Sequence, residues 1–484
     1  MYFEGVYYLY LQKKHLLTQK NYICCMKIFA VIIGCFFFIS VFSQKYNLEF
    51  TIQNIPNPKV YLLSFYGDDN KLVDSLSGIG SGKFTTTFTD KNKPGLYRLF
   101  IDRETTIDFI FNKENVVFNT DYNESVDSMK IVQSEENKLY YEFLKKDRQY
   151  QRKLELISPL VTNYPKDDKF YLDVKKQYTL IQNDRDAFVS ALIAKNPQSY
   201  AAKIFKIKKT PFIDSELNEY DKMEYLKKHF WDNVDFNDTA LFHSNVFTSK
   251  VLSFLMLYNN RNYPPHIQEE AFINAVDVIL PKARVNKKAY EFIMNFMMSG
   301  FENFKFERVL EHISKNYKIE TNCENEERKS TLQKRLDTYQ LLNIGKNAPE
   351  ISTPDVNGNI ITFEQIKTEF TVLVFWATWC PHCTEMLPEI NKIYKAQSTK
   401  RFEIIAFSLD TNKTQWTDFV KHHNFSFYNI SDLKSWDSKL SDDYCIYATP
   451  TMFVLDNKRK ILAKPITVPE LLESLQRLKI LDDK

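Results

Sequence analysis

The sequence predicts a multidomain protein with an N-terminal antiparallel β-sandwich, a central all-α region and a C-terminal α/β domain. Glycine placement separates the first two parts, because five of the ten glycines lie between residues 67 and 95 and none occurs between residues 96 and 299. Short alternating apolar runs accompany the glycine-rich stretch, as in a sheet with one buried face. After residue 343, apolar strands alternate with helical patterns, which is typical of a sheet covered by helices.

Composition and charge restrict the class of protein. Apolar residues make up 44% of the 484 residues and charged residues 26%, a balance typical of globular chains rather than disordered ones. The formal charge is +3, and residues 1–43 hold four lysines against one glutamate, so the rest of the chain is neutral. We therefore expect no nucleic-acid partner that depends on a global basic field. Seven scattered cysteines argue against a disulfide scaffold.

The segment 1–43 is expected to be a secretory signal. Residues 28–42 are fifteen residues without a charge, preceded by Lys27 and followed by Ser43, which fits the pattern of a segment cleaved before Gln44. Fifteen residues are short for a membrane-spanning helix, which favours cleavage. Retention of the segment as an uncleaved membrane anchor is the alternative. The expected location is the periplasm or cell envelope.

Two accessory parts are predicted to follow the signal. Residues 45–128 carry short runs such as 48–52 and 107–111 between turn signals, which indicates a small β-sandwich accessory domain. Residues 130–340 form a helical region, in which apolar side chains from 171 to 192 keep the spacing of one buried helix face. We find no catalytic constellation in either part and expect an accessory module that faces a partner or the cell wall.

Residues 343–484 are predicted to alternate strands and helices. The expected strands are 371–377, 402–409, 451–455 and 461–466, of which the last two form a hairpin, and the expected helices are 384–395, 414–422 and 469–478.

The chemistry of the chain is expected at Cys380 and Cys383, which follow an apolar strand and open a helix. Two cysteines at this spacing can close a disulfide, and the first sulfur lies beside the unpaired N–H groups at the positive end of the helix dipole. That environment stabilises a thiolate, which is the nucleophilic form. The alternative is half of a zinc site, but Cys323 and Cys445 are isolated and supply no second pair, so we expect no metal.

Residues 375–383, FWATWCPHC, resemble the active-site signature of the thioredoxin superfamily. The segment 448–451, ATPT, matches the cis-proline loop that faces the disulfide in that family. The lead-in at 345–349 and 355–358 is similar to the TlpA/ResA-like branch of exported thiol–disulfide oxidoreductases. The preceding regions resemble, less specifically, the N-terminal part of envelope TlpA-like proteins with a domain of unknown function.

The resemblance implies a thioredoxin-like fold for residues 343–484. It also implies that Cys380 attacks a substrate disulfide and that Cys383 releases the mixed disulfide, without a cofactor. Protein disulfides or dithiols are the implied substrates, and a membrane electron donor is the implied partner. A cis bond between Thr449 and Pro450 is expected to turn the Thr449 backbone toward substrate.

Three residues around the pair are expected to tune its redox balance, namely Trp379, Pro381 and His382. An imidazole that is protonated or donates a hydrogen bond favours the thiolate, and so the dithiol form. The Pro381-His382 dipeptide resembles that of strongly oxidising DsbA-like proteins, whereas the surrounding sequence resembles TlpA-like reductants. The sequence therefore leaves the direction of electron flow open.

The chain departs from the family at the proton acceptor for the second cysteine. Val374 stands where thioredoxins carry a buried Asp, and Met386 stands where ResA-like proteins carry Glu. Glu385 and water are the alternatives. Cys445 is interpreted as a packed thiol, with a role as a third redox thiol as the alternative.

Two other functions compete with an exported thiol–disulfide oxidoreductase. One is an envelope binding protein in which the thioredoxin-like domain is a redox-sensitive holder. The other is a peroxiredoxin-like thiol peroxidase, although Ala377 stands where the motif of that family has threonine.

Overall fold

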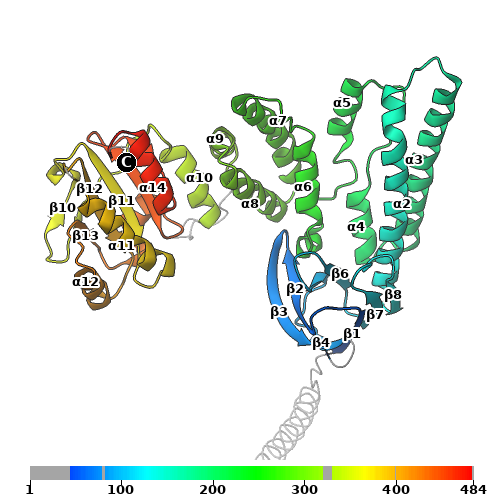
Figure 1. The fold of residues 1–484 in the computed structure, drawn as a ribbon, viewed down its shortest axis with the longest axis horizontal. Coiled ribbons are helices and arrows are strands. Elements are labelled where there is room, and N and C mark those ends of the chain that lie inside the picture. The colour runs from blue at the N-terminus through cyan, green and yellow to red at the C-terminus, as the bar shows by residue number, and fades with distance from the viewer. Residues whose placement is uncertain (1–43, 79–81, 320–329, 398, 482–484) are drawn as a thin grey trace, which may run out of the picture. The chain divides into compact units, whose positions relative to one another are not determined.

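The computed structural model describes residues 44–78, 82–319, 330–397 and 399–481 (Figure 1). The predicted signal segment, residues 1–43, lies outside the described residues. The described chain forms two compact units. One holds the residues up to Glu216 together with Ala240–Asn245, and the other holds Leu217–Thr239 and the residues from Val246 onward.

The first unit begins with a β-sandwich of two four-stranded sheets, ordered β4-β1-β7-β8 and β3-β2-β5-β6. The strands are β1 (Lys45–Gln53), β2 (Lys59–Tyr66), β3 (Asp69–Ser77), β4 (Lys83–Thr89), β5 (Gly95–Phe100), β6 (Thr106–Phe111), β7 (Val116–Asp121) and β8 (Lys130–Gln133). The antiparallel prediction is correct for every described pair except β1 and β7, which run parallel from Leu48↔Val116 to Gln53↔Asp121. Five strands intervene in the chain between these two, which supplies the crossover that a parallel pair requires.

Aromatic side chains from both sheets fill the sandwich core. In β1, alternate residues are buried, as expected for a strand with one face inside. The rings of Phe50 in β1 and Phe109 in β6 lie 5.0 Å apart between centroids, and those of Tyr46 and Phe111 lie 5.3 Å apart. These contacts join the inner faces of the two sheets.

Helices α2 (Glu135–Asn163), α3 (Lys169–Lys195) and α4 (Tyr200–Lys208) continue the first unit (Figure 1). Ser134 caps α2 by accepting a hydrogen bond from the Asn137 N–H at 2.9 Å. The buried Asn137 amide donates to the Ile110 carbonyl at 2.7 Å and accepts from the Ile110 N–H at 2.8 Å. This pair of bonds fastens the start of α2 to strand β6.

The second unit contains further helices and the α/β domain. The helices before the domain are α5 (Glu219–His229), α6 (Val246–Met256), α7 (Pro265–Ala283), α8 (Lys287–Asn303), α9 (Glu307–Asn316) and α10 (Thr331–Leu341). Helix α10 is linked to both neighbouring parts of the unit. Arg335 forms an ion pair with Glu302 of α8 at 2.6 Å, and Lys334 forms one with Asp442 of the α/β domain at 2.8 Å.

The C-terminal domain is a five-stranded sheet, ordered β13-β12-β11-β14-β15, with helices packed around it (Figure 1). Its strands are β11 (Phe370–Trp376), β12 (Phe402–Ser408), β13 (Tyr428–Ile430), β14 (Thr451–Asp456) and β15 (Ile461–Ala463), preceded by the short pair β9 (Thr353–Pro354) and β10 (Ile360–Ile361). Its helices are α11 (Pro381–Lys395), α12 (Lys413–His422), α13 (Lys439–Asp443) and α14 (Val468–Arg477). Strands β11, β12 and β13 are parallel, while β14 and β15 are antiparallel to their neighbours. This is the thioredoxin-like α/β arrangement that the sequence predicts.

Most predicted boundaries in this domain differ from the structure by at most one residue, but two are wrong by three. The last strand was expected to reach Ile466 but ends at Ala463, and Pro465, which has no N–H for a ladder bond, follows shortly after. Helix α11 begins at Pro381, earlier than the expected start at Thr384, because proline is favoured in the first turn of a helix. Across the described ranges, no helix has an apolar stretch long enough to span a bilayer.

Candidate active site

The cysteine pair lies where the central strand of the α/β sheet meets a helix. Every residue of β11 from Thr371 to Trp376 is buried, and a short turn then leads to α11. Cys380 is the N-cap of that helix, and its Sγ accepts a hydrogen bond from the Cys383 N–H at 3.3 Å. The two cysteines form a disulfide, with Cα atoms 5.3 Å apart. The structure thus confirms the predicted position of the first sulfur on the N–H groups of a helix start.

The two sulfurs differ in access from solvent. The Cys380 residue is 6% exposed and Cys383 is fully buried at 0%. Pro381 occupies the first helical position, where its missing N–H costs no hydrogen bond, because the first N–H groups of a helix have no partner within the helix. A reagent or substrate that approaches the helix start therefore meets Cys380 before Cys383.

The loop before β14 faces the disulfide. The Thr449–Pro450 peptide bond is cis, as the sequence predicts. The Thr449 carbonyl oxygen lies 3.5 Å from Cys380 Sγ. The Thr449 backbone, which is expected to bind substrate, is therefore already in contact with the first sulfur. The Thr449 N–H has no hydrogen-bond partner in the described part of the chain and remains available to an extended peptide.

The predicted tuning residues lie on the solvent side of the pair. Trp379 is 52% exposed, and both Pro381 and His382 are exposed. Among the described residues, the His382 side chain makes no hydrogen bond or ion pair, so its influence on the sulfurs stays a prediction. Sequence reasoning missed Trp436, whose ring centroid lies 6.0 Å from that of Trp379. Trp379 directly precedes Cys380 in the chain, and the Trp436 ring is half-buried, so this pair of rings is joined to the first cysteine through Trp379.

Sequence reasoning also missed Asp410, which is only 1% exposed. Its carboxylate accepts hydrogen bonds from the Thr378 N–H at 3.0 Å, the Thr378 hydroxyl at 2.6 Å and the Ser408 hydroxyl at 2.6 Å. Thr378 lies two residues before Cys380, so Asp410 anchors the turn that carries the first sulfur. The sequence does contain a signal for Asp410. It is a polar residue just after the buried parallel strand β12, and active sites form at the edge of a sheet where such strands end.

The residues weighed as proton acceptor or as third redox thiol differ in burial. Glu385 is exposed on α11, while Val374 and Met386 are buried. Cys445 is 2% exposed and is not in a disulfide with a described residue. Within the described ranges, no group of three or more His, Cys, Asp or Glu side chains is arranged to hold a metal ion.

A disulfide at a helix start, opposite a cis-proline loop, in a sheet of this order defines a thioredoxin-like domain. Residues 344–464 match the AhpC/TSA family, and residues 171–306 match a domain of unknown function, DUF5106. The thiol–disulfide oxidoreductase ResA of Bacillus cereus is 31% identical over 125 residues, which cover 26% of this chain and 70% of that protein. ResA of Bacillus subtilis is 28% identical over 118 residues, covering 24% of this chain and 64% of that protein.

A solved structure is also similar in sequence. It is the C-terminal domain of a putative thiol–disulfide oxidoreductase from Bacteroides thetaiotaomicron, 30% identical, covering 28% of this chain and 95% of that one, with a TM-score of 0.27. The match to ResA of Bacillus cereus, at 31% identity over 70% of that protein, is extensive enough to show the family. Through its C-terminal domain, the chain belongs to the ResA-like thiol–disulfide oxidoreductases.

Proposed function

We propose that the protein is an exported enzyme that exchanges disulfides with protein substrates through Cys380 and Cys383. The observation that carries the proposal is the unequal access to the two sulfurs. Cys380 is the more accessible sulfur and lies on a helix start opposite Thr449, whereas Cys383 is fully buried one helical turn further on. This arrangement suits one attacking and one resolving sulfur.

The exchange proceeds in two steps from the dithiol form. The Cys380 thiolate attacks one sulfur of a substrate disulfide, that S–S bond breaks, and the departing substrate sulfur takes up a proton. Cys383, after losing its proton, attacks Cys380 Sγ and breaks the mixed disulfide. Two electrons have then passed to the substrate, which leaves as a dithiol, and the Cys380–Cys383 disulfide has formed. A membrane electron donor returns two electrons to the pair, and the same steps in reverse oxidise a substrate dithiol.

Protein substrates are proposed to bind as an extended segment along the cis-proline loop. The unpaired Thr449 N–H supports this mode, because a backbone donor beside the sulfur can pair with a carbonyl of the substrate. Trp379 and Trp436 supply an aromatic surface for an apolar substrate side chain next to the reacting disulfide.

Export to the periplasm or cell envelope is part of the proposal. The uncharged run 28–42 after Lys27 supports it, and an oxidising compartment is where disulfide exchange with folded substrates is needed. We also retain the division into a signal segment at 1–43, accessory domains at 45–128 and 130–340, and the redox domain at 343–484 as a proposal.

Trapping of the mixed disulfide tests the proposed exchange. The reduced Cys383→Ser variant, incubated with a protein that contains a disulfide, should accumulate a covalent complex through Cys380, and the Cys380→Ser variant should not. The Cys445→Ser variant is the matched control and should turn over like the unchanged protein. A complex joined through Cys445, or full turnover by Cys380→Ser, would contradict the proposal.

A thiol peroxidase is the second candidate, because residues 344–464 match the AhpC/TSA family. The same variants distinguish it. Consumption of hydrogen peroxide that depends on Cys380 and exceeds the rate of disulfide exchange would favour the peroxidase.

A further inference from the structure

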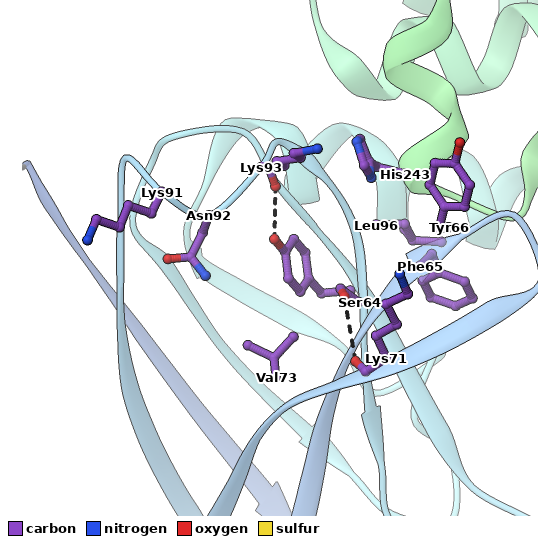
Figure 2. Close-up of a pocket in the computed structure, with 11 residues that line it drawn as sticks. Ser64, Phe65, Tyr66, Lys71, Val73, Lys91, Asn92, Lys93, Leu96 and His243 are labelled. Atoms are coloured by element: carbon purple, nitrogen blue, oxygen red, sulfur yellow. Dashed lines mark hydrogen bonds between the residues drawn. The ribbon is translucent and has the colours of Figure 1, made fainter. Parts of the chain in front are cut away.

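A pocket of about 400 Å³ opens on the β-sandwich of the first unit (Figure 2). Its walls come from strands β2, β3 and β5, the loop before β5, and His243 from a distant part of the chain. The volume lies within the range of small-molecule sites. Every residue that lines it belongs to the first unit, so the pocket is separate from the cysteine pair.

The pocket is positively charged. Lys71, Lys91 and Lys93 line it, and no acidic side chain does so among the described residues. All three lysines are exposed, and none has an ion pair within the described ranges. Burial lowers the pKa of His243, and the charges of Lys93 and Lys71 lower it further.

Aromatic and polar groups complete the lining. Tyr66 and His243 stand side by side on one wall, with ring centroids 5.7 Å apart (Figure 2). The buried Tyr97 donates its hydroxyl to the Lys93 carbonyl at 2.9 Å, which fixes the loop that carries Lys91 and Lys93 to strand β5. Asn92 also lines the pocket. A lining that combines aromatic rings, an amide and ammonium groups suits a ring that carries both hydroxyl groups and a negative charge.

The wall that carries His243 is fastened to the sandwich. A Cβ on Gly95 would lie 2.6 Å from the His243 carbonyl oxygen, so only glycine allows this close approach. The Gly67 N–H donates to the Phe242 carbonyl at 2.9 Å, and the Tyr200 hydroxyl donates to the His243 carbonyl at 3.3 Å. The pocket is therefore preformed rather than a chance gap beside a loop.

We propose that this pocket binds an acidic sugar, that is, a hydroxylated ring with one carboxylate. Lys71 and Lys93 would pair with the carboxylate, the Tyr66 ring would cover one face of the sugar, and Asn92 would bond to ring hydroxyls. The site is independent of the thiol chemistry, and its test does not depend on the redox state of the cysteine pair.

Isothermal titration calorimetry of the full chain with D-glucuronate at low ionic strength tests the proposal. We expect a single site, with D-glucose binding at least about tenfold more weakly because the charged hydrogen bonds are lost. Inorganic phosphate should also bind more weakly, because it has no ring face. Equal affinity for phosphate and glucuronate would overturn the sugar assignment, and absence of glucuronate binding would overturn the site.

Substitutions locate the binding site. Lys71→Gln and Lys93→Gln should each weaken glucuronate binding by about tenfold, and Tyr66→Ala should weaken it as well. Lys59→Gln is the matched control, because Lys59 is an exposed lysine of the same sheet that lies outside the pocket, and its affinity should be unchanged. If Lys59→Gln weakens binding as much as Lys93→Gln does, the binding is not at the pocket.

Discussion

Cys380 Sγ lies 3.5 Å from the carbonyl oxygen of Thr449, although 69 residues separate them in the chain. Sheet pairing explains the contact. Strands β11 and β14 are antiparallel neighbours, with Phe375 opposite Thr451, so the turn that leaves β11 and the loop that enters β14 meet at one edge of the sheet. The site is therefore a product of strand order as much as of the local cysteine motif.

Asp410 is expected to be a positioning residue for the turn that carries Cys380. Asp410→Asn replaces a buried carboxylate that accepts from Thr378 and Ser408, so it should lower the free energy of unfolding by about 2 kcal/mol. It should also slow alkylation of Cys380 in the reduced protein, whereas loss of stability alone would expose the thiol and speed its alkylation. Urea unfolding and alkylation rates measure both effects. Asp418→Asn, at an exposed position on α12, is the control. If the two variants have the same stability and the same alkylation rate, Asp410 does not position the turn.

His382 is expected to favour the dithiol form. His382→Pro removes the imidazole beside the pair, so the reduced form loses stabilisation and the reduction potential should fall by about 30 mV or more, a tenfold change in the exchange equilibrium. Equilibration with glutathione buffers measures the potential. His422→Gln, at the end of α12, is the control. A potential that stays the same or rises would show that the exposed imidazole does not act on the sulfurs.

Trp436 is expected to bind protein substrates without taking part in the thiol chemistry. Trp436→Ala removes half of the aromatic surface, so kcat/KM for a protein disulfide should fall roughly five- to tenfold. The rate with a small disulfide should be unchanged, because a small disulfide has no apolar protein side chain to pack on this surface. Phe304→Ala removes an exposed ring elsewhere in the same unit and is the control. Equal losses with both kinds of disulfide would instead indicate damage to the active site.

Lys250 is expected to make stability depend on pH in the alkaline range. Burial lowers its pKa from the ordinary 10.5 to about 8, and its ammonium lies 4.1 Å from the centroid of the Phe230 ring. Between these two pKa values the unfolded chain binds a proton that the folded chain does not. The free energy of unfolding should therefore rise with pH across this window, by about 1.4 kcal/mol for each pH unit.

The Lys250→Met variant isolates this contribution from those of other groups. The difference in free energy of unfolding between the unchanged protein and the variant should increase from pH 8 to pH 10.5 and be constant below pH 8. Urea titrations across this range measure the difference. A difference that does not vary with pH would refute the lowered pKa of Lys250.

Local patterns predicted the parts of the site that depend on neighbouring residues. The spacing of Cys380 and Cys383 after an apolar strand indicated a helix start, and the motif around Pro450 indicated the facing loop. Asp410 and Trp436 could not be placed in the same way, because their contacts with the cysteine turn depend on how distant strands pair. The parallel pairing of β1 with β7 was missed for the same reason, since alternation predicts a strand but not its neighbour.

The central claim, that Cys380 is the attacking sulfur and Cys383 the resolving one, is tested most directly by mapping which cysteine of the reduced protein is alkylated first. Iodoacetamide at limiting concentration and pH 7, followed by peptide mass spectrometry, gives the order. Cys380 should be modified first, at a pH below the value of about 8.5 at which an ordinary thiol ionises, while the fully buried Cys383 stays protected. Modification of Cys383 before Cys380 would contradict the account.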